Sequence, residues 1–87
     1  MKFEILFRSA AMKQFQALSK TDQRLIAAKI DKLAEDAKPV GSKKLKGHDA
    51  LWRIRSGSLR VVYLQPDDEA KIFILKIGNR GRVYRNL

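Results

Sequence analysis

The chain has 87 residues, 45% of them hydrophobic and 32% charged, which suits one small domain (residues 1–87) with a single core. It has no cysteine and one histidine, so composition excludes a disulfide framework and a thiolate metal site, and we expect neither a metal nor a cofactor. No apolar run approaches the length of a membrane span, and Glu4 and Arg8 stand where a signal peptide would be apolar. We therefore expect a cytoplasmic protein with no membrane partner.

Positive charge is concentrated in the second half of the chain. Nineteen Lys and Arg against nine Asp and Glu leave a net charge of +10. Residues 1–37 hold seven basic against five acidic side chains, a net of +2, whereas residues 38–87 hold twelve against four, a net of +8. Charge that served only solubility would be spread over the chain and not concentrated in residues 38–87. The pattern indicates an anionic partner, and its arginine content favours nucleic acid.

The N-terminal half is predicted to form a strand and two helices. Alternating apolar residues over positions 2–7 predict the strand. Helical spacing of apolar residues predicts a helix that has Ser9 as its N-cap and runs to about Leu18. A second helix, with Thr21 as its N-cap, should end before Pro39. A short link between the two helices predicts a helical hairpin.

The C-terminal half is predicted to form a long loop and three strands. The loop spans residues 38–50, and the strands span 51–56, 59–65 and about 71–78. The last two strands are apolar on both faces, which is typical of strands inside a sheet. The fold class is therefore α+β, with element order β-α-α-β-β-β. The helical hairpin should pack on one face of a largely antiparallel sheet and leave the other face open.

The first two of these strands carry the most informative pattern. Side chains alternate faces along a strand, so Arg53 and Arg55 should point away from the face that holds Trp52 and Ile54. If Arg60 returns across the Gly/Ser turn onto the same face, three guanidinium groups gather there. Like charges repel, and a rigid surface tolerates them best where a polyanion binds. The pattern thus predicts a phosphate-binding face.

The ordered set of elements, together with five short motifs, resembles the RelE/ParE toxin superfamily over the whole chain. The motifs are Lys44-Leu45-Lys46-Gly47, Leu51-Trp52-Arg53-Ile54-Arg55, Arg60-Val61-Val62-Tyr63, Ile77-Gly78-Asn79-Arg80 and Val83-Tyr84. The resemblance implies a RelE-like fold and the toxin of a type II toxin–antitoxin pair. It also implies an inhibitory, RelB-like antitoxin that wraps the toxin. The basic surface adds that the antitoxin segment should be acidic or apolar.

Two branches share this fold. RelE-like members are endoribonucleases that cleave mRNA in the ribosomal A site, and ParE-like members poison DNA gyrase and lack the nuclease residues. The positions of the RelE pattern are matched here by Arg53, Arg55, Arg60, Arg80 and Tyr84. The match favours a ribosome-dependent, metal-independent nuclease in which the 2′-hydroxyl attacks the scissile phosphate. A ParE-like gyrase inhibitor and a non-catalytic nucleic-acid-binding member are the alternatives.

The resemblance suggests a role for each of these positions. Arg60 and Arg80 would hold the scissile phosphate through bidentate hydrogen bonds, and Tyr84 would stack on a base. The best-known RelE pattern has lysines where this chain has Arg53 and Arg55. Arginine cannot give up its proton, so either these residues act by electrostatics and positioning or another group is the general base.

The loop before the arginine strands offers further candidates. Lys43, Lys44 and Lys46 could contact ribosomal RNA phosphates, or they could simply form a solvated loop. His48 has the only side chain whose ordinary pKa lies near neutrality. It could serve as the missing base or contact RNA, although a lone loop histidine is more often an ordinary surface residue.

Overall fold

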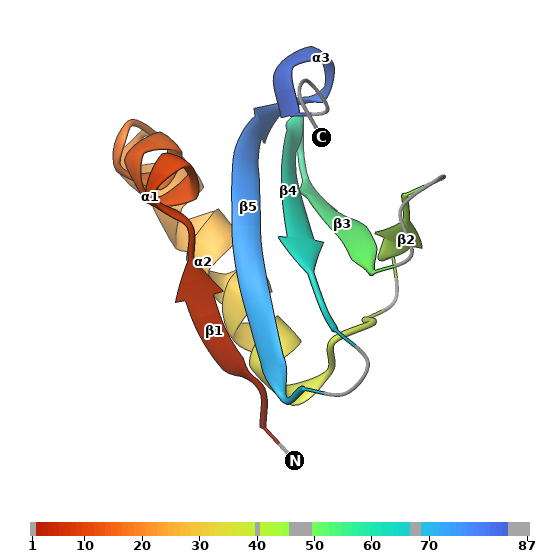
Figure 1. The fold of residues 1–87 in the computed structure, drawn as a ribbon. Coiled ribbons are helices and arrows are strands. Elements are labelled where there is room, and N and C mark those ends of the chain that lie inside the picture. The colour runs from red at the N-terminus through yellow and green to blue at the C-terminus, as the bar shows by residue number, and fades with distance from the viewer. Residues whose placement is uncertain (1, 40, 46–49, 67–68, 84–87) are drawn as a thin grey trace.

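The computed structural model describes residues 2–39, 41–45, 50–66 and 69–83, which build one five-stranded sheet and three helices (Figure 1). In chain order the elements are β1 (Glu4–Phe7), α1 (Ser9–Gln16), α2 (Lys20–Glu35), β2 (Lys43–Lys44), β3 (Leu51–Ser56), β4 (Leu59–Leu64), β5 (Lys71–Asn79) and α3 (Arg80–Val83). The predicted α+β class and the order of the main elements are confirmed. The structure adds β2 within the predicted loop and α3 after the last strand.

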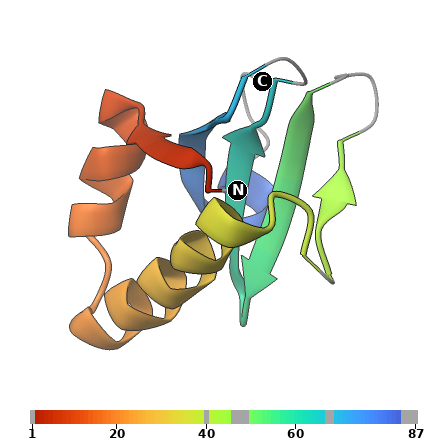
Figure 2. The same ribbon diagram turned by 90° about the horizontal axis from the view of Figure 1, so that it is seen from below.

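The sheet has the strand order β1-β5-β4-β3-β2. Every pairing is antiparallel except that of β1 with β5, which is parallel. The strands that are apolar on both faces, β4 and β5, therefore lie inside the sheet, as their composition predicts. Helices α1 and α2 lie on one face of the sheet (Figure 2).

The two N-cap predictions are wrong, and the reason is local. Ser9 is the first helical residue of α1, behind an extended Arg8. Helix α2 begins two residues earlier than predicted, because Ser19 is extended and its hydroxyl accepts a hydrogen bond from the Asp22 main-chain N–H at 3.1 Å. Thr21 consequently lies within the first turn of the helix.

The helical link is held by one side chain. The Gln23 amide donates to the main-chain oxygens of Phe15 and Leu18, at 3.2 Å in each case. These contacts give hydrogen-bond partners to carbonyls at the end of α1 and tie them to the first turns of α2. A side chain of α2 thus holds the short link between the two helices in place.

The main core lies between the helices and the sheet. Its buried members come from α1, α2, the segment just after α2 and the inward faces of β3, β4 and β5: Ala11, Ile26, Ile30, Leu33, Ala37, Ile54, Val61, Tyr63, Ile72, Ile74 and Ile77. Val62 and Val83 are also buried, at 0% and 2% exposure, but they are not part of this core cluster. Because α3 contacts β4 and β5, the opposite face is covered at that point rather than fully open.

Candidate functional site

The β3–β4 hairpin brings two arginines directly opposite each other. Its register pairs Arg55 with Arg60, so the two side chains share one face of the sheet. The turn between the strands contains Gly57 with φ of 59°, a left-handed conformation that glycine adopts without strain. Arg55 is exposed and Arg60 is half-buried. We call this pair the first basic row.

The alternation of faces on β3 is as predicted. Ile54 is buried in the core beneath the helices, and Trp52 packs against the same cluster. The Nζ atom of Lys38 lies 5.0 Å from the centre of the Trp52 ring, a cation–π contact at the edge of that core. Trp52 is therefore on the helix side of the sheet and outside the face that carries the arginines.

A second set of cations lies one step along the same face. Arg53 pairs with Val62 of β4, and Val62 pairs with Lys76 of β5. On the other side of Arg53, the register of β2 places Lys43 opposite it. Residues that pair directly share a face, so Lys43, Arg53 and Lys76 form a line of cations across the sheet, which we call the second basic row.

The structure divides the predicted loop lysines between two faces. Lys43 stands in the second basic row, whereas Lys44 pairs with Trp52 and so belongs to the helix side. Lys46 and His48 lie outside the described residues. The sequence predicts a loop here, in which side chains have no defined alternation, so it does not separate these lysines by face.

The position of Arg60 within the first basic row is partly fixed by the turn. Its guanidinium donates to the main-chain oxygen of Gly57 at 3.4 Å and to that of Leu59 at 3.5 Å. Both contacts are long, so they hold the group weakly. The guanidinium can leave these carbonyls for an anion, to which it would make shorter, charge-assisted hydrogen bonds.

The remaining predicted residues come after β5. Asn79, at the end of β5, pairs with Leu59, and Arg80 begins α3 immediately afterwards. The main chain of Arg80 therefore starts beside the strand that holds Arg60. The side chain of Arg80 and the whole of Tyr84 lie outside the described part of the structure, so their predicted roles stay predictions.

Sequence reasoning missed Lys76 as a member of this face. The apolar run Ile72–Leu75 gives no indication of which residues face the helices, and Lys76 follows it directly. The structure reveals the change of face, because Ile74 and Ile77 are both buried although they are three residues apart. A regular strand cannot place residues three apart on the same face.

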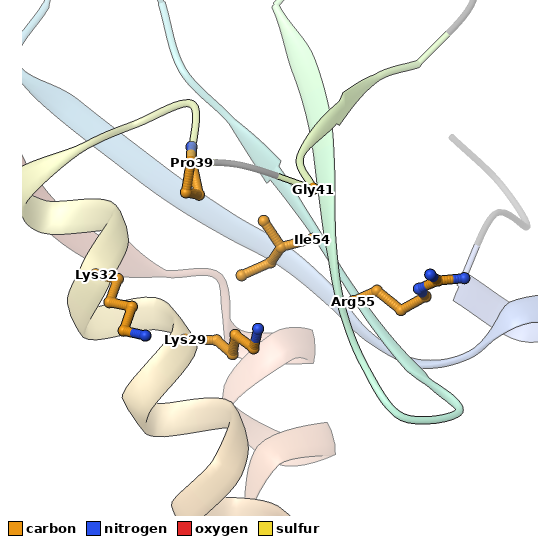
Figure 3. Close-up of a pocket in the computed structure, with 6 residues that line it drawn as sticks. All are labelled: Lys29, Lys32, Pro39, Gly41, Ile54 and Arg55. Carbon is orange, nitrogen blue, oxygen red and sulfur yellow. The ribbon is translucent and has the colours of Figure 1, made fainter.

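A hollow lies on the other side of β3. It is an open pocket of about 400 Å³ between α2 and β3, with Ile54 and Pro39 as apolar lining. Lys29 and Lys32 extend from α2 towards it, whereas Arg55 points away to the opposite side of the strand (Figure 3). Arg55 still contributes to the lining of this pocket, and the two basic rows lie on the sheet face opposite the helices.

A buried tyrosine fixes the chain segment that leads into the basic face. Tyr63 is fully buried, and its hydroxyl donates to the main-chain oxygen of Ala37 at 2.7 Å. Burial raises the pKa of Tyr63 from 10.0 to about 12, because the ionised form would lose its hydration. The bond joins the segment after α2 to β4, at the centre of the sheet.

Two general properties complete the description. Among the described residues, no three His, Cys, Asp or Glu side chains are grouped as metal ligands would be. The helices in the described ranges are all too short or too polar to cross a bilayer. The described cations of the basic face carry guanidinium and ammonium groups, which bind and neutralise anions.

Comparisons with known proteins place the chain in a family. Residues 5–84 match the family model described as ParE toxin of type II toxin-antitoxin system, parDE. A protein of Escherichia coli named as a RelE-like toxin is 31% identical over 84 residues, covering 94% of this chain and 87% of the relative. One of Methanocaldococcus jannaschii named as toxin RelE1 is 30% identical over 89 residues, covering 99% of each chain.

A solved structure agrees with these sequence matches. The RelE–RelB complex of the archaeon Pyrococcus horikoshii contains a chain that superposes with a TM-score of 0.81 and 30% identity, covering 94% of this chain and 99% of that one. The intact RelBE complex of E. coli gives a TM-score of 0.78 at 24% identity, which supports the fold. The chain therefore belongs to the ParE toxin family of type II toxin–antitoxin systems and is a RelE-like toxin of the RelE/ParE superfamily.

Proposed function

We propose that this toxin is an endoribonuclease that cleaves mRNA in the ribosomal A site and thereby inhibits translation in the cytoplasm. The observation that carries the proposal is the direct pairing of Arg55 with Arg60 on the sheet face opposite the helices. Two guanidinium groups on neighbouring strands can donate to oxygens of one phosphate from two sides. The similarity to RelE-like toxins supports the nuclease branch.

The proposed reaction uses the 2′-hydroxyl of the message as its nucleophile. The 2′-hydroxyl of one nucleotide loses its proton and its oxygen attacks the adjacent phosphorus. The bond from phosphorus to the 5′-oxygen breaks, the leaving 5′-oxygen takes up a proton from water, and a cyclic phosphate and a 5′-hydroxyl result. Negative charge develops on the phosphate oxygens, where Arg60, Arg80 and Arg55 would stabilise it. Arg53 would neutralise a neighbouring phosphate, and Tyr84 would stack on a base to align the reacting atoms.

Positioning and electrostatics carry most of the rate enhancement in this proposal. A guanidinium group is a poor general base, so in this proposal neither Arg53 nor Arg55 takes the proton of the 2′-hydroxyl. That proton passes to another acceptor, with water, the ribosome and His48 as the candidates. The ribosome holds the message and so supplies part of the alignment that a free RNA lacks.

The same face explains the need for an antitoxin. The solved neighbours from P. horikoshii and E. coli are toxin–antitoxin complexes of RelE with RelB. Without an antitoxin to cover it, an exposed surface in a chain with net charge +10 would bind RNA without selection. We propose a RelB-like partner that wraps this toxin and whose toxin-binding segment carries acidic and apolar residues.

Programmed ribosomes test the proposed reaction. Purified wild-type protein, Arg60→Ala and Lys13→Ala are each added to ribosomes with a defined A-site codon, and cuts are mapped by primer extension. Lys13 is exposed on α1, in the helical layer, so it serves as the charge-matched control. The proposal predicts cuts in the A-site codon with the wild type and Lys13→Ala, and none on naked mRNA. Equal cleavage by Arg60→Ala would contradict the site.

The match to the ParE family model favours one other candidate function. A ParE-like toxin would bind DNA gyrase by surface contacts and would need no RNA chemistry. Induction of the wild-type protein would then produce double-strand DNA breaks while ribosomes stay active. Translation arrest with intact DNA supports the nuclease instead.

A further inference from the structure

A β-bulge in β5 sends Lys76 to the basic face. The register pairs Tyr63 with Ile74 and the preceding Val62 with Lys76, so Leu75 is an extra residue on β5. The bulge reverses the alternation of β5 at this point. Ile74 and Ile77 both face the core, and Lys76 faces the opposite side with Arg53.

The bulge is fixed by a side chain from the helical layer. The Oε1 atom of Gln14 in α1 accepts a hydrogen bond from the Ile77 main-chain N–H at 2.7 Å. This contact gives a partner to a main-chain donor in the stretch where the ladder with β4 is irregular. Bulges beside functional sites commonly re-aim a single side chain, and here that side chain is Lys76.

Lys76 joins the second basic row above a buried residue. Val62 separates Arg53 from Lys76 in the register and is fully buried. Lys76 itself is half-buried, as expected if its aliphatic stem lies along the apolar surface and its ammonium group reaches solvent. Three cations in one row repel one another in the free protein, and an anion placed among them would relieve that repulsion.

The two basic rows follow each other along the strands with a regular spacing. Arg53 and Arg55 are two residues apart on β3, and two residues of a strand span about 6.6 Å. This separation is close to that of successive phosphates in an extended RNA strand. Beside the first row, Gly78 pairs with Arg60 and leaves open space, since a Cβ there would meet no atom within 4 Å.

We propose that the RNA strand lies along β3 and β4, with the scissile phosphate at the first basic row and the neighbouring phosphate at the second, where Lys76 binds it. The inference rests on the proposed nuclease function and adds a substrate-binding residue to it. Lys76 acts by holding the message, so it affects substrate binding more than the chemical step.

Kinetics on ribosome-bound message and direct RNA binding test this role. The informative variant is Lys76→Met, which removes the charge and keeps an unbranched apolar stem over Val62. Lys76→Arg restores the charge. Lys13→Ala is the control. We expect Lys76→Met to raise KM about tenfold with kcat nearly unchanged. Lys76→Arg should recover most of the loss, and thermal melts should show that every variant is folded.

The binding measurement separates this inference from the proposed function. An oligoribonucleotide with one 2′-deoxynucleotide at the scissile position cannot be cleaved, so its affinity is measured at several salt concentrations. Loss of one phosphate contact should make the slope of log affinity against log salt less negative by about 0.7 in Lys76→Met. If wild type does not cleave mRNA, this result still supports the second row as a phosphate site. An unchanged affinity, slope and KM in Lys76→Met would overturn the inference, even if Arg60→Ala abolishes cleavage.

Discussion

Arg55 and Arg60 stand directly opposite each other on neighbouring strands of the β3–β4 hairpin, with like charges on the same face. Such a pair destabilises a sheet by roughly 0.2–1 kcal/mol in the free protein. The arrangement is unfavourable for folding and favourable for holding an anion between the two groups. It is the structural basis for placing the scissile phosphate at this row.

Removal of one charge from the pair should stabilise the free protein. For Arg55→Gln, relief of about 0.5 kcal/mol of repulsion predicts a rise in Tm of about 2–4 °C at low salt. The rise should shrink at high salt, because exposed charges are then screened. Thermal melts at both salt concentrations, with Lys13→Gln as control, measure it. A lower Tm for Arg55→Gln at low salt would contradict the repulsion.

Loss of Arg60 should remove transition-state stabilisation. We expect Arg60→Ala to reduce the single-turnover rate of cleavage on programmed ribosomes by about 10²–10³-fold, the usual effect of deleting one group that stabilises a developing oxyanion. Its affinity for an acidic antitoxin should fall far less, since many contacts share that interface. A rate within a factor of three of the Lys13→Ala control would remove Arg60 from the site.

The hydroxyl of Tyr63 should make stability depend on alkaline pH. The unfolded tyrosine ionises near pH 10 and the folded one near pH 12, so between these values the folded state binds more protons and stability falls as pH rises. The shift corresponds to at most about 2.7 kcal/mol.

The matched variant is Tyr63→Phe, which loses the hydrogen bond to Ala37, for a cost of about 1 kcal/mol at neutral pH. Because phenylalanine does not ionise, the advantage of the wild type should decrease from pH 10 to 12. Urea unfolding across this range gives both curves, and parallel curves would refute the predicted ionisation.

The cap of α2 can be tested with three serine and threonine variants. Ser19→Ala removes the hydrogen bond to the Asp22 N–H and should destabilise the protein by about 1 kcal/mol. Ser9→Ala and Thr21→Ala, at the positions expected from sequence to be caps, should change stability by less than about 0.5 kcal/mol. Denaturant unfolding would contradict the assignment if Thr21→Ala gave the largest loss.

Much of the fold follows from local pattern. The alternation of Trp52 and Ile54 with Arg53 and Arg55 predicts both the boundaries of β3 and its two faces, because a pleated strand separates odd from even positions. The pairing of Arg60 with Arg55 follows from the short turn between the strands. These features depend only on residues near one another in sequence.

The features that sequence missed depend on contacts between distant parts. The bulge that re-aims Lys76 involves Val62 on another strand and Gln14 on α1, and an apolar run on β5 hides the change of face. The strand β2 exists through its pairing with β3. The choice of Ser19 over Thr21 as a cap depends on where α1 ends, which local propensity leaves open.

The most direct test of the proposed chemistry uses a message with a single 2′-deoxynucleotide at the mapped cleavage position in the A site of programmed ribosomes. Attack by the 2′-oxygen requires that hydroxyl, so the wild-type toxin should leave this message intact while it cuts the all-ribose message. Cleavage of the substituted message at the same bond would show that another nucleophile acts and would contradict the proposed mechanism.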